Sequence, residues 1–238
     1  MDTREKLRQL RAAVATSDGR ALVAHIGKNG LSEHSLQLIG DGLLAALEQG
    51  IDGARQQAAQ CLDALRERGW DGDDDLADQL AAALGEGPMP MLRPLAVPLD
   101  ELATILEGDP LSGGGRIDLT TGEVWHRAAI EYAQEIGEED PDDEDPDRWL
   151  YVECEGSRSG YRDMEWFIVT VSDPRRVELL DIAIRGRGAF RRFKDVLNRW
   201  PDEVDRWYAF SGDRELGRAR SWLAAAGYRP SPREPPPA

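Results

Sequence analysis

Apolar residues recur at every third or fourth position through the first 87 residues, a spacing typical of amphipathic helices. Glycines and helix-capping residues separate the apolar segments. Five helices are predicted: from the capping-box pattern at Asp2–Glu5 to about Thr16, over 21–26 with a stop at Asn29-Gly30, from Ser32 to Gly50, from Asp52 to Gly69, and over 76–84. Because short helices bury their apolar stripes against one another, we expect an all-α bundle of helical hairpins.

In the second half of the chain, some segments have the hydrophobic spacing of helices and others the alternation of strands. A short amphipathic helix is predicted over 98–106, and alternating residues around a Thr121-Gly122 turn predict a β-hairpin over 116–125. Residues 149–153 form a further predicted strand, and helices are expected over 164–171 and 175–185. The fold class is therefore α+β, with an N-terminal helical bundle joined to an α+β domain that has a small sheet.

The helix predicted from Gly188 has the clearest pattern. Phe190, Phe193, Leu197 and Trp200 share one face, Ala189 and Val196 lie at its edge, and Arg191, Lys194, Asn198 and Arg199 take the other face. Trp207-Tyr208-Ala209-Phe210 is then expected to form a short strand or turn. Asp213 is expected to cap a last helix that ends at Gly227.

Composition divides the chain near the same place as the pattern. Residues 1–87 contain no proline and one aromatic residue, Trp70, whereas all 14 prolines lie at or after Pro88. This change predicts a helical domain over 1–87, a proline-rich linker over 88–97 and a second domain over 98–228. The proline-rich tail 229–238 is expected to be disordered.

The formal net charge of −16 disfavours non-specific adhesion to nucleic acids or anionic membranes. Residues 131–147 hold ten acids and no base, which predicts a solvated loop. The two cysteines, one in each predicted domain, fit a reducing compartment. No apolar run is long enough for a signal or membrane segment, so we expect a cytoplasmic protein with no membrane association. We expect neither a cofactor nor a metal, since the acids at 71–75 and the pair His25 and His34 lack ligand spacing.

One basic segment opposes the acidic background. Residues 185–199 hold six cations and one acid, around the block Gly-Arg-Gly-Ala-Phe-Arg-Arg-Phe-Lys-Asp at 186–195. Outward amides at a helix start and forked arginine donors favour a phosphate. The expected ligand-binding residues are Arg187, Gly188, Arg191, Arg192, Lys194, Trp207 and Tyr208. The aromatic side chains Trp200, Trp207 and Tyr208 are candidates for stacking a base. Alternatively, these arginines pair with the acidic loop or with Asp181 and Asp195. In a third arrangement the acidic loop covers them until a ligand displaces it.

Several segments of the second half resemble the bacterial uncharacterised protein family 0158. They are Thr121-Gly122-Glu123-Val124, Met164 with Phe167-Ile168, the block at 186–195, Trp207-Tyr208-Ala209-Phe210, and Trp222-Leu223. The resemblance covers roughly residues 98–228. It implies domain boundaries and an α+β fold, and it implies no activity and no catalytic residues.

These features favour a non-enzymatic binding or regulatory protein. Its expected ligand is a phosphate, a nucleotide or a single-stranded nucleic acid. Its N-terminal helices are expected either to contact another protein or to cap the second domain. No catalytic residue is assigned, because His126 has no nucleophile in a recognisable motif nearby and Cys154 lies between two glutamates. The alternatives are a phosphate-handling enzyme that uses the same arginines, and a purely structural or adaptor protein.

Overall fold

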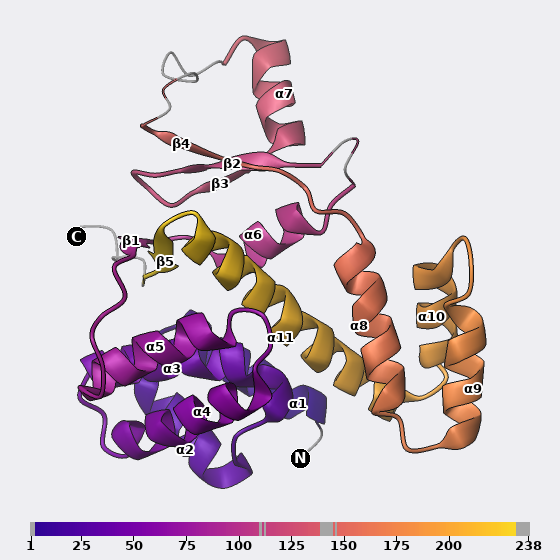
Figure 1. Cartoon of the computed structure of the whole chain (residues 1–238), viewed down its shortest axis with the longest axis horizontal. Helices are drawn as coiled ribbons and strands as arrows, with labels where there is room; N and C mark the ends of the chain where they lie inside the picture. Colours follow the sequence, from indigo (N-terminus) through magenta and orange to yellow (C-terminus); the bar gives the residue numbers. More distant parts are fainter. Residues whose placement is uncertain (1–2, 110, 112, 139–144, 146, 232–238) are drawn as a thin grey trace. The chain divides into compact units, whose positions relative to one another are not determined.

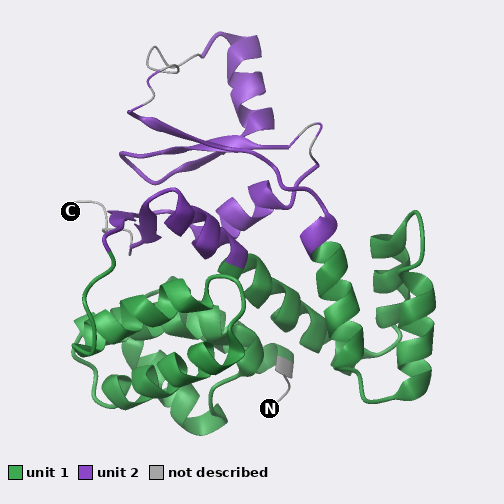
Figure 2. Ribbon diagram, in the orientation of Figure 1, with its two compact units in different colours: residues 1–90, 160–217 green, residues 91–159, 218–238 purple. Residues whose placement is uncertain are grey.

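The computed structural model of the chain describes residues 3–109, 111, 113–138, 145 and 147–231. The chain divides into two compact units (Figure 2), one made of residues 1–90 and 160–217 and the other of residues 91–159 and 218–238. The first break falls in the predicted linker. The predicted domain 98–228, however, is distributed over both units, because Trp70 of the helical region packs into the same core as Phe210.

The N-terminal helices of the first unit confirm the predicted helical region. They are α1 (Thr3–Ala15), α2 (Gly19–Asn29), α3 (Leu36–Glu48), α4 (Ala54–Arg68) and α5 (Asp73–Leu84) (Figure 1). Gly69 and Gly85 end their helices in the left-handed conformation, as the sequence indicates. The third helix differs at its start, where Ser32 precedes a separate 3₁₀ turn, η1 (Glu33–Ser35), and makes no capping hydrogen bond with its side chain.

The rest of the first unit is also helical. Its elements are α8 (Arg158–Val169), α9 (Pro174–Ala183), α10 (Ala189–Leu197) and α11 (Pro201–Ala225). Residues 158–159 of α8 and residues 218–225 of α11 are assigned to the second unit. The predicted helices near 164–171, 175–185 and 188–200 are confirmed. Phe167, Phe193, Trp207 and Phe210 form the aromatic centre of their core.

The second unit contains the sheet. Strands β2 (Gly115–Asp118), β3 (Val124–His126) and β4 (Trp149–Val152) pair in the antiparallel order β3-β2-β4, with helix α6 (Leu99–Leu106) on one side of the sheet and α7 (Arg127–Ile136) on the other (Figure 1). The predicted hairpin is confirmed, and Gly122 supplies the positive φ of its turn. A separate parallel pair joins β1 (Arg93–Leu95), within the predicted linker, to β5 (Tyr228–Pro230).

Two predicted regions need correction. The acidic loop was expected to begin at residue 131, but residues 131–136 belong to helix α7, which the helix formers Ala128, Ala129 and Ala133 favour. Residues 139–144 and 146 of that loop lie outside the described residues, as do Asp2 of the first capping box and residues 232–238 of the predicted disordered tail.

The second correction concerns helix α11. Residues 207–210 are neither strand nor turn, and Asp213 caps nothing, because one uninterrupted helix runs through both. Gly217 permits close packing rather than ending the helix: a Cβ atom there would lie 2.1 Å from the carbonyl oxygen of Asp71. The carboxylate of Asp213 is buried and accepts hydrogen bonds from the backbone N–H of Gln37 at 2.9 Å and from the Arg68 guanidinium at 2.5 Å.

Burial raises the pKa of Asp213 to about 6, although the charge of Arg68 opposes this shift. In the unfolded chain the ordinary pKa is 3.8. Between these values the native state binds more protons than the unfolded state, so this group stabilises the fold as the pH falls.

We therefore predict that the free energy of unfolding of the natural chain, relative to Asp213→Asn, rises by about 2 kcal/mol from pH 7 to pH 4. Urea unfolding followed by circular dichroism at each pH measures this difference. Asp63→Asn, at an exposed position of α4, is the control and should show no such trend. A difference that stays flat or shrinks in acid contradicts the prediction.

Candidate anion-binding hairpin

Helices α9 and α10 form a hairpin whose connecting loop contains the basic block. Asp173 begins α9, where its side chain accepts hydrogen bonds from the amides of Arg175 and Arg176. Gly186 and Gly188 both have a positive φ, of 78° and 80°, which a residue with a side chain rarely adopts. The two glycines therefore allow the chain to reverse direction within a few residues.

The Arg192 guanidinium holds this loop together. Its Nε donates to the carbonyl oxygen of Ala183 at 3.0 Å, one terminal nitrogen donates to those of Arg185 at 2.6 Å and Gly186 at 3.3 Å, and the other donates to that of Arg187. Four of its five N–H groups are thus used within the chain. Arg192 was expected to bind a ligand, but its contacts make it the residue that shapes the loop.

The inward carbonyls fix where the amides point. In a planar trans peptide the N–H is directed opposite to the C=O, so the N–H groups of residues 186–188 point away from Arg192. Helix α10 begins directly after them, with no side-chain cap. Among the described residues, no acceptor binds any backbone N–H from 186 to 191. Six consecutive donors therefore remain available to a ligand or water.

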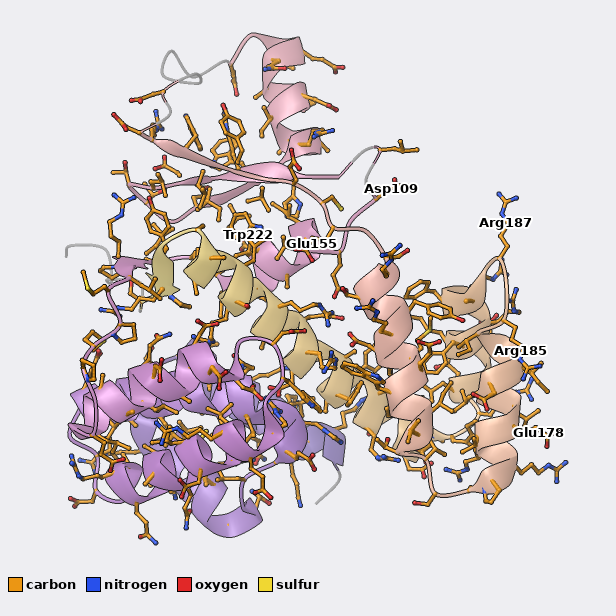
Figure 3. The ribbon with its side chains drawn as sticks, in the orientation of Figure 1. Asp109, Glu155, Glu178, Arg185, Arg187 and Trp222 are labelled. Carbon is orange, nitrogen blue, oxygen red and sulfur yellow. The ribbon has the colours of Figure 1, made fainter. Side chains whose placement is uncertain are left out.

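Five exposed cations lie in this loop and on the helix after it: Arg185 and Arg187 in the loop, Arg191 and Lys194 on α10, and Arg199 beyond the C-terminal end of α10. In the described part of the chain, the one ion pair that these five residues form joins Arg191 to Asp195 at 3.9 Å, with side chains 91% and 65% exposed. Arg185 and Arg187 point outward from the hairpin, as does Glu178 (Figure 3). Of the acids predicted to pair with these cations, Asp195 forms an ion pair with Arg191. Asp181 forms no ion pair with them in the described part of the chain.

Of the predicted aromatic partners, Trp207 is buried and does not join this surface. Trp207 is 6% exposed, and its ring centroid lies 4.8 Å from that of Phe193 in the core, so no base can stack on it. Trp200 is half-buried beside Arg176, whose guanidinium carbon lies 5.1 Å from its ring centroid. Tyr208 is exposed on α11.

Sequence reasoning missed the position of Phe190. The buried residues of α10 are Ala189, Phe193 and Leu197, whereas Phe190 is 37% exposed. The spacing of four from Ala189 identifies this face, whereas the predicted face began at Phe190 and had Ala189 at its edge. The structure therefore places one exposed aromatic ring beside the basic residues.

Other candidate groups stay unassigned. Among the described residues, no cluster of three or more His, Cys, Asp or Glu side chains could hold a metal ion. The Cys154 thiol donates to the carbonyl oxygen of Leu106 at 3.6 Å. In the same part of the chain, no helix has the length and apolar character needed to cross a bilayer.

We predict that Arg192→Ala lowers the free energy of unfolding by about 1–2 kcal/mol, because four carbonyl oxygens lose a charged donor. Arg192→Lys should not restore stability, since one ammonium group cannot reproduce the planar fork. Denaturant unfolding provides the measurement, with Arg191→Ala as the matched control that changes stability by less than about 0.5 kcal/mol. Equal losses in the two alanine variants would falsify this assignment.

Comparison with known proteins identifies relatives of the chain and no activity. The sequence profile of the Uncharacterised protein family (UPF0158) matches residues 116–235, about half of the chain. A protein of Pseudomonas aeruginosa, named UPF0158 protein PA5073, is 26% identical over 152 residues, which cover 61% of this chain and 92% of the relative. No solved structure matches. The resemblance predicted from the basic block and the segments around it is thereby confirmed, and the chain belongs to the UPF0158 family.

Proposed function

We propose that this chain is a non-enzymatic binding or regulatory protein whose α9–α10 hairpin binds a phosphate-bearing ligand: a phosphate, a nucleotide or a single-stranded nucleic acid. The observation that carries the proposal is the row of six backbone amides without acceptors, from 186 to 191, bordered by exposed guanidinium groups. The N-terminal helices are proposed as the surface for a partner protein. The residues proposed to contact the ligand are Arg187, Gly188, Arg191 and Lys194, with Arg185 added.

Phosphate is the anion that suits this set of donors. Arginine presents two parallel N–H groups that match two phosphate oxygens, and the amides at the start of α10 add the partial positive charge of a helix N-terminus. Arg192 already holds the loop carbonyls, so binding does not require the loop to refold. These features support binding through preorganised donors.

Charge supports the same conclusion. The hairpin, residues 174–199, contains eight cationic and three acidic residues, in a chain with a net charge of −16. A polyanion is repelled by most of such a chain and attracted where cations gather. Binding is favoured over phosphate chemistry because Asp195, the carboxylate paired with these cations, is largely exposed rather than shielded for proton transfer.

We predict that the double variant Arg187→Ala, Arg191→Ala binds inorganic polyphosphate and a labelled twelve-nucleotide single strand at least about tenfold more weakly in low salt. Its plot of log affinity against log salt should be shallower by about 1.4 for the single strand, since two phosphate contacts are lost. Fluorescence anisotropy measures binding of the labelled oligonucleotide directly. Polyphosphate binding is measured by competition with the labelled oligonucleotide or by the shift in melting temperature.

The matched control is Arg20→Ala, Arg66→Ala. This variant changes the net charge equally at two exposed arginines of the N-terminal helices, and it should bind within about twofold of the natural chain. If both double variants weaken binding alike, attraction is spread over the surface and the hairpin site is wrong. If the natural chain binds neither polyphosphate nor the single strand, the proposed function is refuted as a whole.

A further inference from the structure

Phe190 lies on the exposed arc of the basic helix. Around α10 the buried positions are Ala189, Phe193 and Leu197, and the neighbouring exposed positions are, in angular order, Phe190, Lys194, Arg191 and Asp195. Three of these four exposed side chains are an aromatic ring and two cations. Phe190 and Lys194 are one turn apart, so their side chains lie on the same side of the helix.

The ring of Phe190 packs against the backbone of α8 at Gly160. A Cβ atom at Gly160 would lie 3.2 Å from Cε1 of Phe190 and 3.5 Å from its Cζ, so the edge of the ring rests over a glycine. Tyr161, the next residue of α8, donates its hydroxyl to the carbonyl oxygen of Ile184 at 3.2 Å. Both contacts link α8 to the hairpin. The ring is therefore held in a defined place while 37% of the residue stays exposed.

Cations lie on both sides of this aromatic residue along the chain. Arg187 precedes it by three residues, while Arg191 and Lys194 follow it, and all three side chains are exposed. Among the described residues, the one ion pair that they form is the 3.9 Å contact of Arg191 with Asp195. Helix α10 alone is about 13 Å long, more than a single phosphate group can contact. The arrangement suits a ligand with several phosphates and an accessible flat ring.

We infer that the phosphate site takes single-stranded nucleic acid and that Phe190 is the residue on which one of its bases stacks. Unpaired bases present their faces to aromatic side chains, whereas a duplex keeps its bases stacked on one another. The cations contact the phosphates on either side of the stacked base. This inference rests on the proposed function and adds the class of ligand and the residue that distinguishes it.

The test compares three probes on the folded full chain: a labelled twelve-nucleotide single strand, the same sequence as a duplex, and inorganic polyphosphate. Phe190→Ala should bind the single strand about tenfold more weakly, because base–aromatic stacking is lost. Its binding of polyphosphate should stay within about twofold, since no ring is stacked there. The natural chain should prefer the single strand to the duplex.

Two further variants separate stacking from packing. Phe190→Tyr keeps an aromatic face and should bind like the natural chain, whereas Phe190→Leu keeps apolar bulk and should bind like the alanine variant. Tyr132→Ala, at an exposed aromatic residue of α7, is the matched control and should change no affinity. If Phe190→Ala destabilises the fold, the tyrosine and leucine pair carries the comparison.

The outcomes distinguish this inference from the function on which it rests. If polyphosphate binds but Phe190→Ala leaves single-strand affinity unchanged, or if leucine serves as well as tyrosine, stacking is refuted and the phosphate site stands. Equal weakening of single-strand and polyphosphate binding by Phe190→Ala also refutes stacking, because the ring then acts only through the fold. If the natural chain binds neither the single strand nor polyphosphate, both proposals fail.

Discussion

Two adjacent buried charges in the middle of α11 hold the first unit together. Asp213 accepts from Arg68 of α4 and from the Gln37 amide at the start of α3, while Arg214 donates to Asp163 of α8. The guanidinium carbon of Arg214 also lies 4.0 Å from the ring centroid of Trp166 and 5.0 Å from that of Trp70. Because a buried charge is costly unless its partners are correctly placed, these pairs restrict how the helices can pack.

The position of α8 passes this constraint to the candidate site. Asp163 ties α8 to α11, Phe167 of the same helix packs 6.3 Å from Phe193 of α10, and Gly160 lies against Phe190. The hairpin therefore has one face fixed by a core and the other open to solvent. Arg192 completes the arrangement by binding the loop carbonyls, so the donors proposed to bind phosphate belong to a loop that is hydrogen-bonded internally.

Local signals were predictable, and long-range ones were not. Glycine stops and hydrophobic periodicity indicated the N-terminal helices, the β-hairpin and the start of α10, because each depends on residues close in sequence, whereas the predicted cap Ser32 makes no capping hydrogen bond with its side chain. The uninterrupted α11 was not predictable from sequence. An aspartate such as Asp213 is typical of a helix N-cap, and its actual partner, Arg68, is 145 residues away along the chain. In the site, the cationic block was visible in the sequence. The separate role of Arg192 was not, because four carbonyls that converge on one guanidinium follow from the loop conformation.

The contrast between an acidic chain and a basic hairpin limits which ligands can bind. A net charge of −16 repels polyanions at long range, but at physiological ionic strength this repulsion is screened beyond about 8 Å. Short-range donors then decide the outcome, and amides and guanidinium groups gain most from oxygens that carry full charge. An exposed phenyl ring adds affinity for flat, unpaired bases and none for inorganic phosphates. In the proposed site, selectivity would therefore arise from the ring, while the cations would set the strength of binding and its dependence on salt.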